Sequence, residues 1–244
     1  MSDQTERPLT PIGIAVALAQ GLRARGRIER LPAAGGPAAG TVAGSSGRTL
    51  RIAVVGESTA AGVGVATQQD GFTAALARRL AATTGASVDW RVAGQDGATA
   101  RRIRHRLVPL LGPGPFDVVV VLAGANDVLS RRPPEQWRED LAAIVDGLAT
   151  ISHRVVVAGT PPFAVFPSLP PTLGRYLAER GRRLDAVTRE LCGSIAHAQF
   201  VGTDPSLIDP AFFARDGFHP GAGGYERWAE LVAGELQLSS SQPA

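Results

Sequence analysis

Five short runs of apolar residues, separated by segments of helical length, constrain the fold of this chain more than any other feature of its sequence. The runs span residues 50–56, 88–93, 116–123, 154–159 and 199–202. Several are continuous stretches of β-branched residues, which suit strands buried on both faces of a parallel sheet. Segments of helical length lie at 69–84, 98–111, 135–149, 173–197 and 222–236. This alternation predicts a three-layer α/β/α sandwich around a five-stranded, doubly wound parallel sheet.

The alternation occupies residues 49–238, a length that fits one domain, and residues 239–244 are expected to form a tail. Residues 1–48 form an extension of different character. An apolar run at 11–22 is followed by arginines at positions 23, 25, 27 and 30. The small residues of 32–48 then indicate a flexible linker.

The apolar run at 11–22 has two interpretations. It is too short to span a bilayer, and positive charge follows it rather than precedes it, unlike in a signal peptide. We therefore expect a cytoplasmic protein by default. The run is either a short helix that packs on the domain or an amphipathic segment that makes weak contact with an anionic membrane surface. The sequence carries no signal for the oligomeric state.

The composition excludes several kinds of chemistry. All 25 residues counted as Lys+Arg are arginine, so neither a lysine Schiff base nor a lysine-containing phosphate loop is available. A single cysteine, Cys192, excludes an internal disulfide and a thiolate-rich metal site, and we expect it to be buried. His105, His153 and His197 are scattered along the chain, which argues against a metal site.

A cluster of basic residues in the segment 98–111 could bind nucleic acid or anionic lipid. Its members are Arg101, Arg102, Arg104, His105 and Arg106. Ile103, Leu107 and Leu110 give the same segment an apolar helical face, so we expect the arginines on the solvated side. The net charge of +3 is also slight for a nucleic-acid binder, and we expect no nucleic-acid partner.

Ser58 and His219 are the first two candidates for catalysis. Ser58 follows the first predicted strand, at a turn where a helix N-terminus could face developing negative charge, although serine also commonly caps helices. Asp216 lies three residues before His219, a spacing that lets the carboxylate orient the imidazole and leave its other nitrogen free as a base. The alternative is a surface loop in which Asp216 caps a turn.

Two further candidates follow the second and third predicted strands. Gly94 could offer a backbone N–H and Asn126 a side-chain amide to an oxyanion, although each also has an ordinary explanation as a turn glycine or a helix cap. The carboxyl ends of parallel strands meet at one sheet edge, where ligands bind. The conjunction of these groups with Ser58 and His219 therefore indicates a catalytic site.

These four blocks resemble those of the SGNH hydrolase family, the GDSL-type esterases and lipases. They are Gly56-Glu57-Ser58, the stretch 92–99, Gly124-Ala125-Asn126-Asp127 and the stretch 216–219. The resemblance implies a flavodoxin-like fold and hydrolysis of small-molecule esters, sometimes thioesters or amides, without a cofactor. It also implies that Ser58 is the nucleophile of a triad with Asp216 and His219, and that Ser58, Gly94 and Asn126 form the oxyanion hole.

The chain departs from the family pattern at three positions. Glu57 replaces the aspartate before the nucleophile, Thr59 replaces the leucine after it, and Val92 replaces an asparagine. None of these changes removes a catalytic group, but they weaken inference about the surroundings of the site and hence about the substrate.

A proline-rich stretch after the fourth predicted strand is a candidate for substrate binding. It carries Phe163, Val165 and Phe166 between prolines, and such a stretch is extended and stiff. These side chains line an acyl pocket, form a lid, or pack over the end of the sheet. A lid would favour medium-chain esters over acetyl esters, and overall we expect esters of small to medium acyl chains as substrates.

Three alternative functions stay open. Within the class, the chain could be a carbohydrate O-acetylesterase, or a thioesterase or lysophospholipase-like acyl hydrolase. The small number of tyrosines and tryptophans, 2 and 3, argues mildly against a sugar platform. From another class, a non-catalytic flavodoxin-like module could bind a ligand in the same cleft, but it would not need the pair Asp216 and His219.

Overall fold

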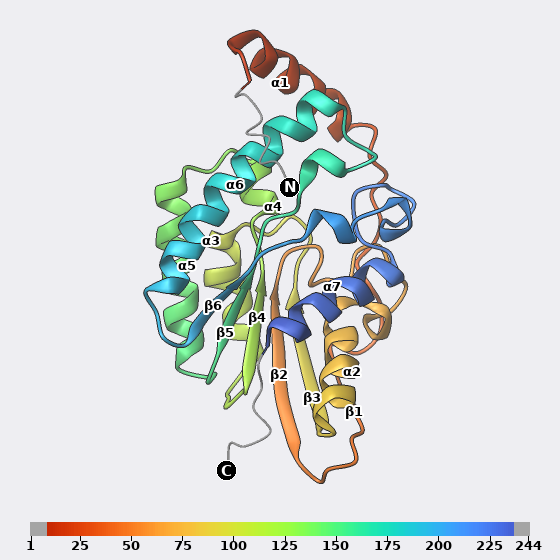
Figure 1. Cartoon of the computed structure of the whole chain (residues 1–244), viewed down its shortest axis with the longest axis vertical. Coiled ribbons are helices and arrows are strands. Elements are labelled where there is room, and N and C mark those ends of the chain that lie inside the picture. Colours follow the sequence, from red (N-terminus) through yellow and green to blue (C-terminus); the bar gives the residue numbers. More distant parts are fainter. Residues whose placement is uncertain (1–8, 237–244) are drawn as a thin grey trace.

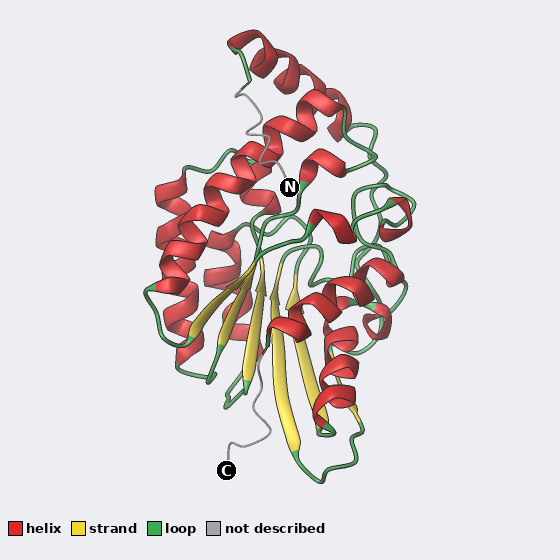
Figure 2. Ribbon diagram, viewed as in Figure 1, coloured by secondary structure: helices red, strands yellow, loops and turns green. Residues whose placement is uncertain are grey.

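The computed structural model describes residues 9–236, which form an α/β/α sandwich around one mixed sheet (Figure 1, Figure 2). The strands are β1 (Ala39–Val42), β2 (Thr49–Gly56), β3 (Ser87–Gly94), β4 (Val118–Leu122), β5 (Val155–Ala158) and β6 (Ala198–Val201). Their order across the sheet is β1-β3-β2-β4-β5-β6. The tail expected at 239–244 lies outside the described residues.

The five-stranded prediction is wrong by one strand, because β1 adds to the sheet edge antiparallel to β3. All other pairings are parallel, as predicted. The extra strand lies within the stretch expected to be a linker. Its residues are small and half exposed, so they carry no hydrophobic pattern. A Cβ on Gly40 would approach the Trp90 ring to 2.7 Å, so the small residue there permits the pairing.

The central strands are buried on both faces because helices cover the sheet on both sides. In β4, Val119 and Val121 face one apolar core while Val118 and Val120 face the other. Alternate side chains of a strand point to opposite faces, so both cores draw on the same continuous valine run. Fully burying each such side chain contributes about 1.5–3 kcal/mol.

The helices divide between the two faces (Figure 1). On one face lie α2 (Phe72–Thr84) and α7 (Ala222–Glu235), and on the other lie α3 (Ala100–Arg102), α5 (Pro134–Ala149) and α6 (Pro171–Gly193). A short helix, α4 (Ala125–Leu129), follows β4. Cys192 is buried at the end of α6, and burial raises the pKa of its thiol to about 11.

The segment 98–111 is not the continuous α-helix that its apolar spacing predicts. After α3 the backbone forms a π-helical turn at Ile103–Leu107 and a 3₁₀ turn at Val108–Leu111. Pro109 explains the interruption, because proline has no N–H for the helical ladder and clashes with the preceding turn. Ile103 and Leu107 are buried as expected, but Leu110 is exposed.

The apolar run of the extension forms α1 (Pro11–Arg25), which packs along α6. Thr10 caps its start by accepting a hydrogen bond from the Gly13 N–H at 3.1 Å, and Pro11 occupies the first turn. Gln20 accepts a hydrogen bond from the Leu173 N–H at 3.1 Å, which connects α1 to the first turn of α6. The extension is thus folded against the domain from α1 onward.

Candidate active site

Ser58 lies in the turn directly after β2 and is in contact with His219. Its Oγ is 3.1 Å from His219 Nε2, so the hydroxyl is positioned to give its proton to the imidazole. The side chain therefore does not cap a helix. The expected helix N-terminus is absent at this point, since residues 57–64 form turns and α2 begins only at Phe72.

Asp216 and His219 lie in the loop before α7, and the carboxylate holds the ring. Asp216 Oδ2 is 2.7 Å from His219 Nδ1, while Oδ1 accepts hydrogen bonds from the backbone N–H groups of Phe218 and His219 at 2.9 and 3.0 Å. Burial raises the pKa of Asp216, but these hydrogen bonds outweigh it and hold the pKa below its ordinary value. The carboxylate thus stays ionised beside the ring, as an orienting group must.

Gly94 ends β3 next to Gly56, the last residue of β2. A Cβ on Gly94 would lie 2.2 Å from the backbone nitrogen of Ala61, so a larger residue could not approach the turn that carries Ser58. The structure therefore brings the Gly94 backbone close to the turn that contains Ser58.

Asn126 lies in the first turn of α4, after the end of β4. Gly124, not Asn126, occupies the cap position, so the side chain of Asn126 is not a helix cap. Its amide Nδ2 donates hydrogen bonds to Glu57 Oε2 at 2.8 Å and to the Ala98 carbonyl oxygen at 3.1 Å. The amide thus joins the ends of β2, β3 and β4 at the edge where Ser58 lies.

Glu57 is a buried carboxylate with three N–H donors. In addition to the amide of Asn126, it accepts hydrogen bonds from the backbone N–H groups of Ala125 and Asn126, both at 3.1 Å. Burial raises its pKa to about 7, although these hydrogen bonds act in the opposite direction. One of the three residues that depart from the family pattern, Glu57, therefore fixes the start of α4.

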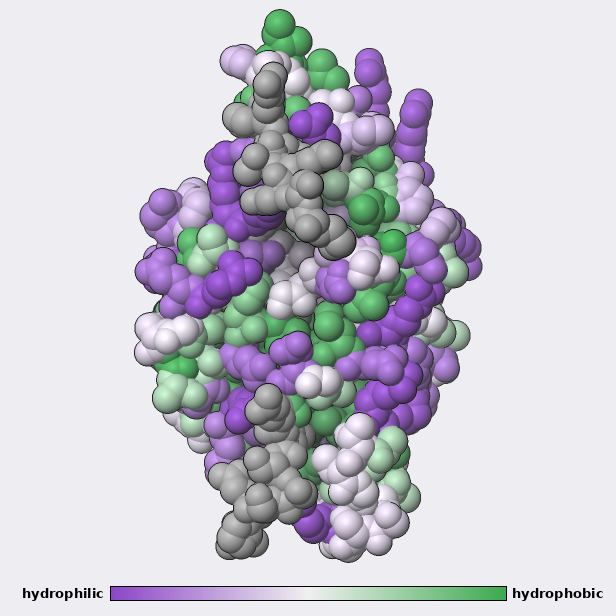
Figure 3. All heavy atoms as spheres, in the orientation of Figure 1, coloured by the Kyte–Doolittle hydropathy of each residue, from purple (hydrophilic) through white to green (hydrophobic). Residues whose placement is uncertain are grey.

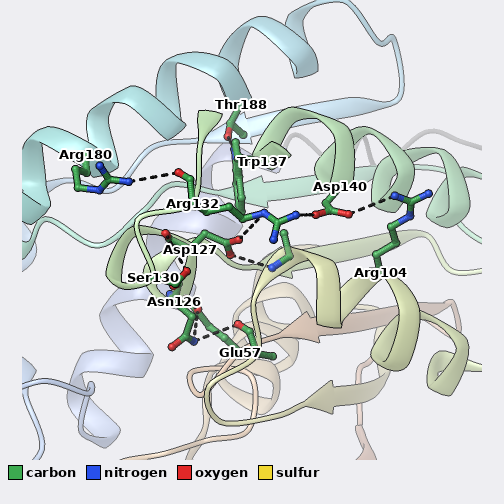
Figure 4. Close-up of polar contacts among 12 residues, drawn as sticks. Glu57, Arg104, Asn126, Asp127, Ser130, Arg132, Trp137, Asp140, Arg180 and Thr188 are labelled. Carbon is green, nitrogen blue, oxygen red and sulfur yellow. Dashed lines mark hydrogen bonds and ion pairs between the residues drawn. The ribbon is translucent and has the colours of Figure 1, made fainter. Parts of the chain in front are cut away.

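An ion-pair network begins at Asp127, the residue after Asn126 (Figure 4). Asp127 accepts a hydrogen bond from the Ala100 N–H at 2.9 Å and pairs with Arg132 at 3.5 Å. Arg132 also pairs with Asp140, which in turn contacts Arg104 at 3.3 Å. Burial raises the pKa of Asp127 to about 6. One arginine of the basic cluster, Arg104, thus serves this network, while the other four members are exposed.

An apolar cavity opens beside Ser58 and His219. Besides these two residues and Glu57, its wall includes Phe166, Leu207, Ile208, Phe212, Phe218 and Trp228. Four of these side chains are aromatic, and the centroid of the Phe166 ring lies 5.3 Å from that of Phe218 in the wall and 5.0 Å from that of Phe213. The Ser58 hydroxyl therefore borders a pocket suited to an apolar group.

The three residues expected to bind substrate lie in different environments. Phe166 lines the cavity. Phe163 is fully buried and packs on Phe166 with the ring centroids 5.3 Å apart, whereas Val165 is 43% exposed and lies outside the cavity wall. Phe166 thus lies where a pocket residue is expected, whereas Phe163 packs beneath it in the core. Substrate binding by these side chains stays a prediction.

Within residues 9–236, no group of three or more His, Cys, Asp or Glu side chains is placed to hold a metal ion.

The model of the GDSL-like lipase/acylhydrolase family matches residues 54–227, a range that contains all four sequence blocks. The chain belongs to this family. The GDSL-like family assignment agrees with the serine, histidine and aspartate that the structure brings together.

A GDSL-like esterase of Mycobacterium tuberculosis is 28% identical over 193 residues, which cover 75% of this chain. The match spans only 60% of the length of that relative. The solved structure of TesA is 27% identical with a TM-score of 0.58, over 77% of this chain and 98% of TesA. A family 3 carbohydrate esterase of Clostridium thermocellum has a TM-score of 0.60 at 19% identity, over 76% and 94% of the two chains, and at that identity shares the fold alone.

Two features of this GDSL-like site escape the sequence patterns. Glu57 stands out only as a departure, and nothing local indicates that its carboxylate reaches Asn126 across 69 positions. Arg132 follows a short helix and has no motif, yet it neutralises two buried aspartates. Only Asp127 could have indicated such a partner in advance. A carboxylate that lies just after a buried strand is expected to be buried, and a buried carboxylate needs a cation or hydrogen-bond donors.

Proposed function

We propose that this chain hydrolyses carboxylic esters by way of an acyl-enzyme on Ser58. The observation that carries the proposal is the continuous chain of contacts from Ser58 Oγ through the His219 ring to Asp216. Those three groups have the roles and order of a serine hydrolase triad. Family membership supports the same reaction class.

The first half of the reaction forms the acyl-enzyme. Ser58 Oγ attacks the ester carbonyl carbon while His219 Nε2 takes the hydroxyl proton, and Asp216 stabilises the resulting imidazolium. The N–H groups of Ser58 and Gly94 and the amide of Asn126 stabilise the oxyanion. Collapse of the tetrahedral intermediate breaks the bond to the alcohol, which leaves with the proton from His219.

The second half releases the acid. A water molecule gives its proton to His219 as its oxygen attacks the acyl carbon, and the second tetrahedral intermediate collapses to return Ser58 Oγ with that proton. No cofactor is needed for any step, because each one exchanges only an acyl group and a proton.

The substrate that the cavity favours is an ester with a small to medium apolar acyl chain. Phe166, Phe212 and Phe218 line the wall beside Ser58, and such a surface gains free energy by covering methylene groups. A series of nitrophenyl esters from acetyl through butyryl and octanoyl to palmitoyl tests this. We expect kcat/KM to rise beyond acetyl and to fall for palmitoyl, and a maximum at acetyl would instead favour an O-acetylesterase.

Thioester hydrolysis is a second candidate, because the same triad acts on both acyl groups. A matched pair of butyryl ester and butyryl thioester, assayed side by side, separates the two preferences. A non-catalytic ligand-binding module would be favoured if none of these substrates turned over, but the direct contact between Ser58 and His219 supports catalysis.

A further inference from the structure

Helix α1 leaves a wide apolar surface uncovered. Its small residues Ala17 and Ala24 are buried on the domain side, and Gly21 packs against Leu173 of α6. A helix that is apolar nearly all round is normally buried all round. Here only one side is, so the opposite side of α1 is left without a partner among the described residues.

Five of the eight exposed large apolar side chains in the described chain belong to α1. They are Ile12, Ile14, Val16, Leu18 and Leu22, and Ile12 and Leu22 are 78% and 81% exposed. Figure 3 shows hydrophobic atoms at the end of the molecule that α1 forms in Figure 1, with hydrophilic side chains projecting beside them. Apolar surface gathered in this way marks an interaction site more often than isolated exposed leucines do.

The charge beside this surface is mainly positive. Arg23, Arg25, Arg27 and Arg30 are exposed and follow the apolar residues directly. Residues 9–28 contain no aspartate or glutamate, and Glu29, the next carboxylate in the sequence after Glu6, pairs with Arg215 at 2.9 Å. Two copies of such a surface would repel each other, whereas anionic phosphate groups would complement it.

The surface is also connected to the catalytic loops. Glu29 pairs with Arg215, the residue before Asp216. The Ala34 N–H donates a hydrogen bond at 3.0 Å to the carbonyl oxygen of Ala61, which lies in the same turn as Ser58. In Figure 1, α1 lies at the end of the molecule toward which β2 and its parallel neighbours run. A partner that covers α1 would therefore lie at the end of the molecule toward which the parallel strands run.

We propose that the exposed face of α1 and the arginines that follow it dock on the surface of an anionic lipid bilayer. No described helix is long and apolar enough to cross a bilayer, so the contact is peripheral. The apolar side chains enter the headgroup region while the arginines bind lipid phosphates, which is how interfacial helices attach. If the proposed ester hydrolysis holds, docking presents the catalytic cavity to the interface at which apolar esters collect.

Sedimentation of the full chain with lipid vesicles tests the proposal. Vesicles of equimolar phosphatidylglycerol and phosphatidylcholine should bind the protein, with affinity that falls as salt rises and is weak for pure phosphatidylcholine. Each arginine near an anionic surface is worth about fivefold in affinity. The double variant Ile12→Ser/Leu22→Ser should bind roughly tenfold or more weakly, because two large apolar contacts are lost.

Two controls make the result specific. Leu110→Ser removes an equally large side chain that is 66% exposed on another helical segment, and should bind like the wild type. Circular dichroism and hydrolysis of a short soluble ester should be unchanged in Ile12→Ser/Leu22→Ser, which separates loss of docking from loss of fold or of catalysis.

Wild-type protein that stays in the supernatant with anionic vesicles would overturn the proposal. So would equal binding by Ile12→Ser/Leu22→Ser and the wild type. A concentration-dependent dimer that disappears in this variant, with no vesicle binding by the wild type, would assign the surface to a second copy of the chain instead.

Discussion

The carboxylate of Glu57 accepts two hydrogen bonds from Asn126, one from the Asn126 backbone N–H at 3.1 Å and one from the Asn126 side-chain amide at 2.8 Å. The residue before the proposed nucleophile thus fixes a proposed oxyanion donor. The second amide hydrogen is given to the Ala98 carbonyl oxygen at 3.1 Å. For Asn126 to stabilise an oxyanion, this longer bond has to yield while the bond to Glu57 keeps the amide in place.

Asn126→Ala tests that role. Losing one oxyanion donor typically lowers kcat by about 10²–10³-fold. We expect a loss of this size on a nitrophenyl ester, with the far-ultraviolet circular dichroism of the folded protein retained. Turnover equal to that of the wild type would remove Asn126 from the oxyanion hole.

Glu57→Gln should change how stability depends on pH. Burial places the pKa of Glu57 at about 7, above the ordinary 4.5, so between these values only the folded chain keeps the proton. The proton linkage is therefore fully stabilising below pH 4.5 and is lost as pH rises through 7, by roughly 2–3 kcal/mol between pH 5 and pH 8. Urea unfolding at both values should show the stability advantage of the wild type over Glu57→Gln shrinking by that amount. Parallel pH profiles would mean that Glu57 titrates at its ordinary pKa.

Arg132→Ala should destabilise the fold strongly. Asp127 and Asp140 have side-chain exposures of 0% and 5%, and the change would leave both without their shared cation. Breaking a buried ion pair from one side costs about 3–5 kcal/mol. Arg138→Ala is the matched control, because its pair with Glu190 is 40% and 72% exposed and should contribute at most about 1 kcal/mol. Chemical denaturation measures the loss of unfolding free energy in both variants. Equal losses would show that the buried network stabilises the fold no more than the exposed ion pair does.

Phe166→Ala should alter chain-length preference. The ring lines the cavity and packs on Phe213 and Phe218, so its removal enlarges the pocket beside Ser58. We expect the nitrophenyl ester with the highest kcat/KM to have a longer acyl chain than in the wild type. The kcat/KM for the acetyl ester should fall by only a few-fold. Val165→Ala lies in the same stretch but outside the cavity wall, and should leave the preference unchanged. An unchanged profile in both variants would place the acyl chain elsewhere.

The place of the proposed catalytic groups in the fold could be predicted because of where parallel strands end. Ser58 and Asn126 each follow a buried, valine-rich strand, and Gly94 ends the strand beside β2. The topology of such a sheet brings these positions to one edge. His219 and Asp216 lie three residues apart, so their contact needs only a local turn.

The remaining structure depends on contacts that no local pattern encodes. Strand β1 is held by backbone pairing with β3, and its small residues carry no periodicity. Glu57 meets Asn126, and Arg132 meets Asp127 and Asp140, through distances set by the packing of α4 and α5. The cavity wall also includes residues that no sequence motif marks, because only the folded chain brings them next to Ser58. They are Leu207, Ile208, Phe212 and Trp228.

Covalent labelling of Ser58 tests the central proposal most directly. The wild type is treated with a fluorophosphonate probe, digested and analysed by mass spectrometry, alongside Ser58→Ala and Thr59→Val, which removes the neighbouring hydroxyl. We expect one adduct, on the peptide that contains Ser58, in the wild type and in Thr59→Val, with neither adduct nor ester hydrolysis in Ser58→Ala. An adduct on another residue, or ester hydrolysis by Ser58→Ala at the wild-type rate, would contradict it.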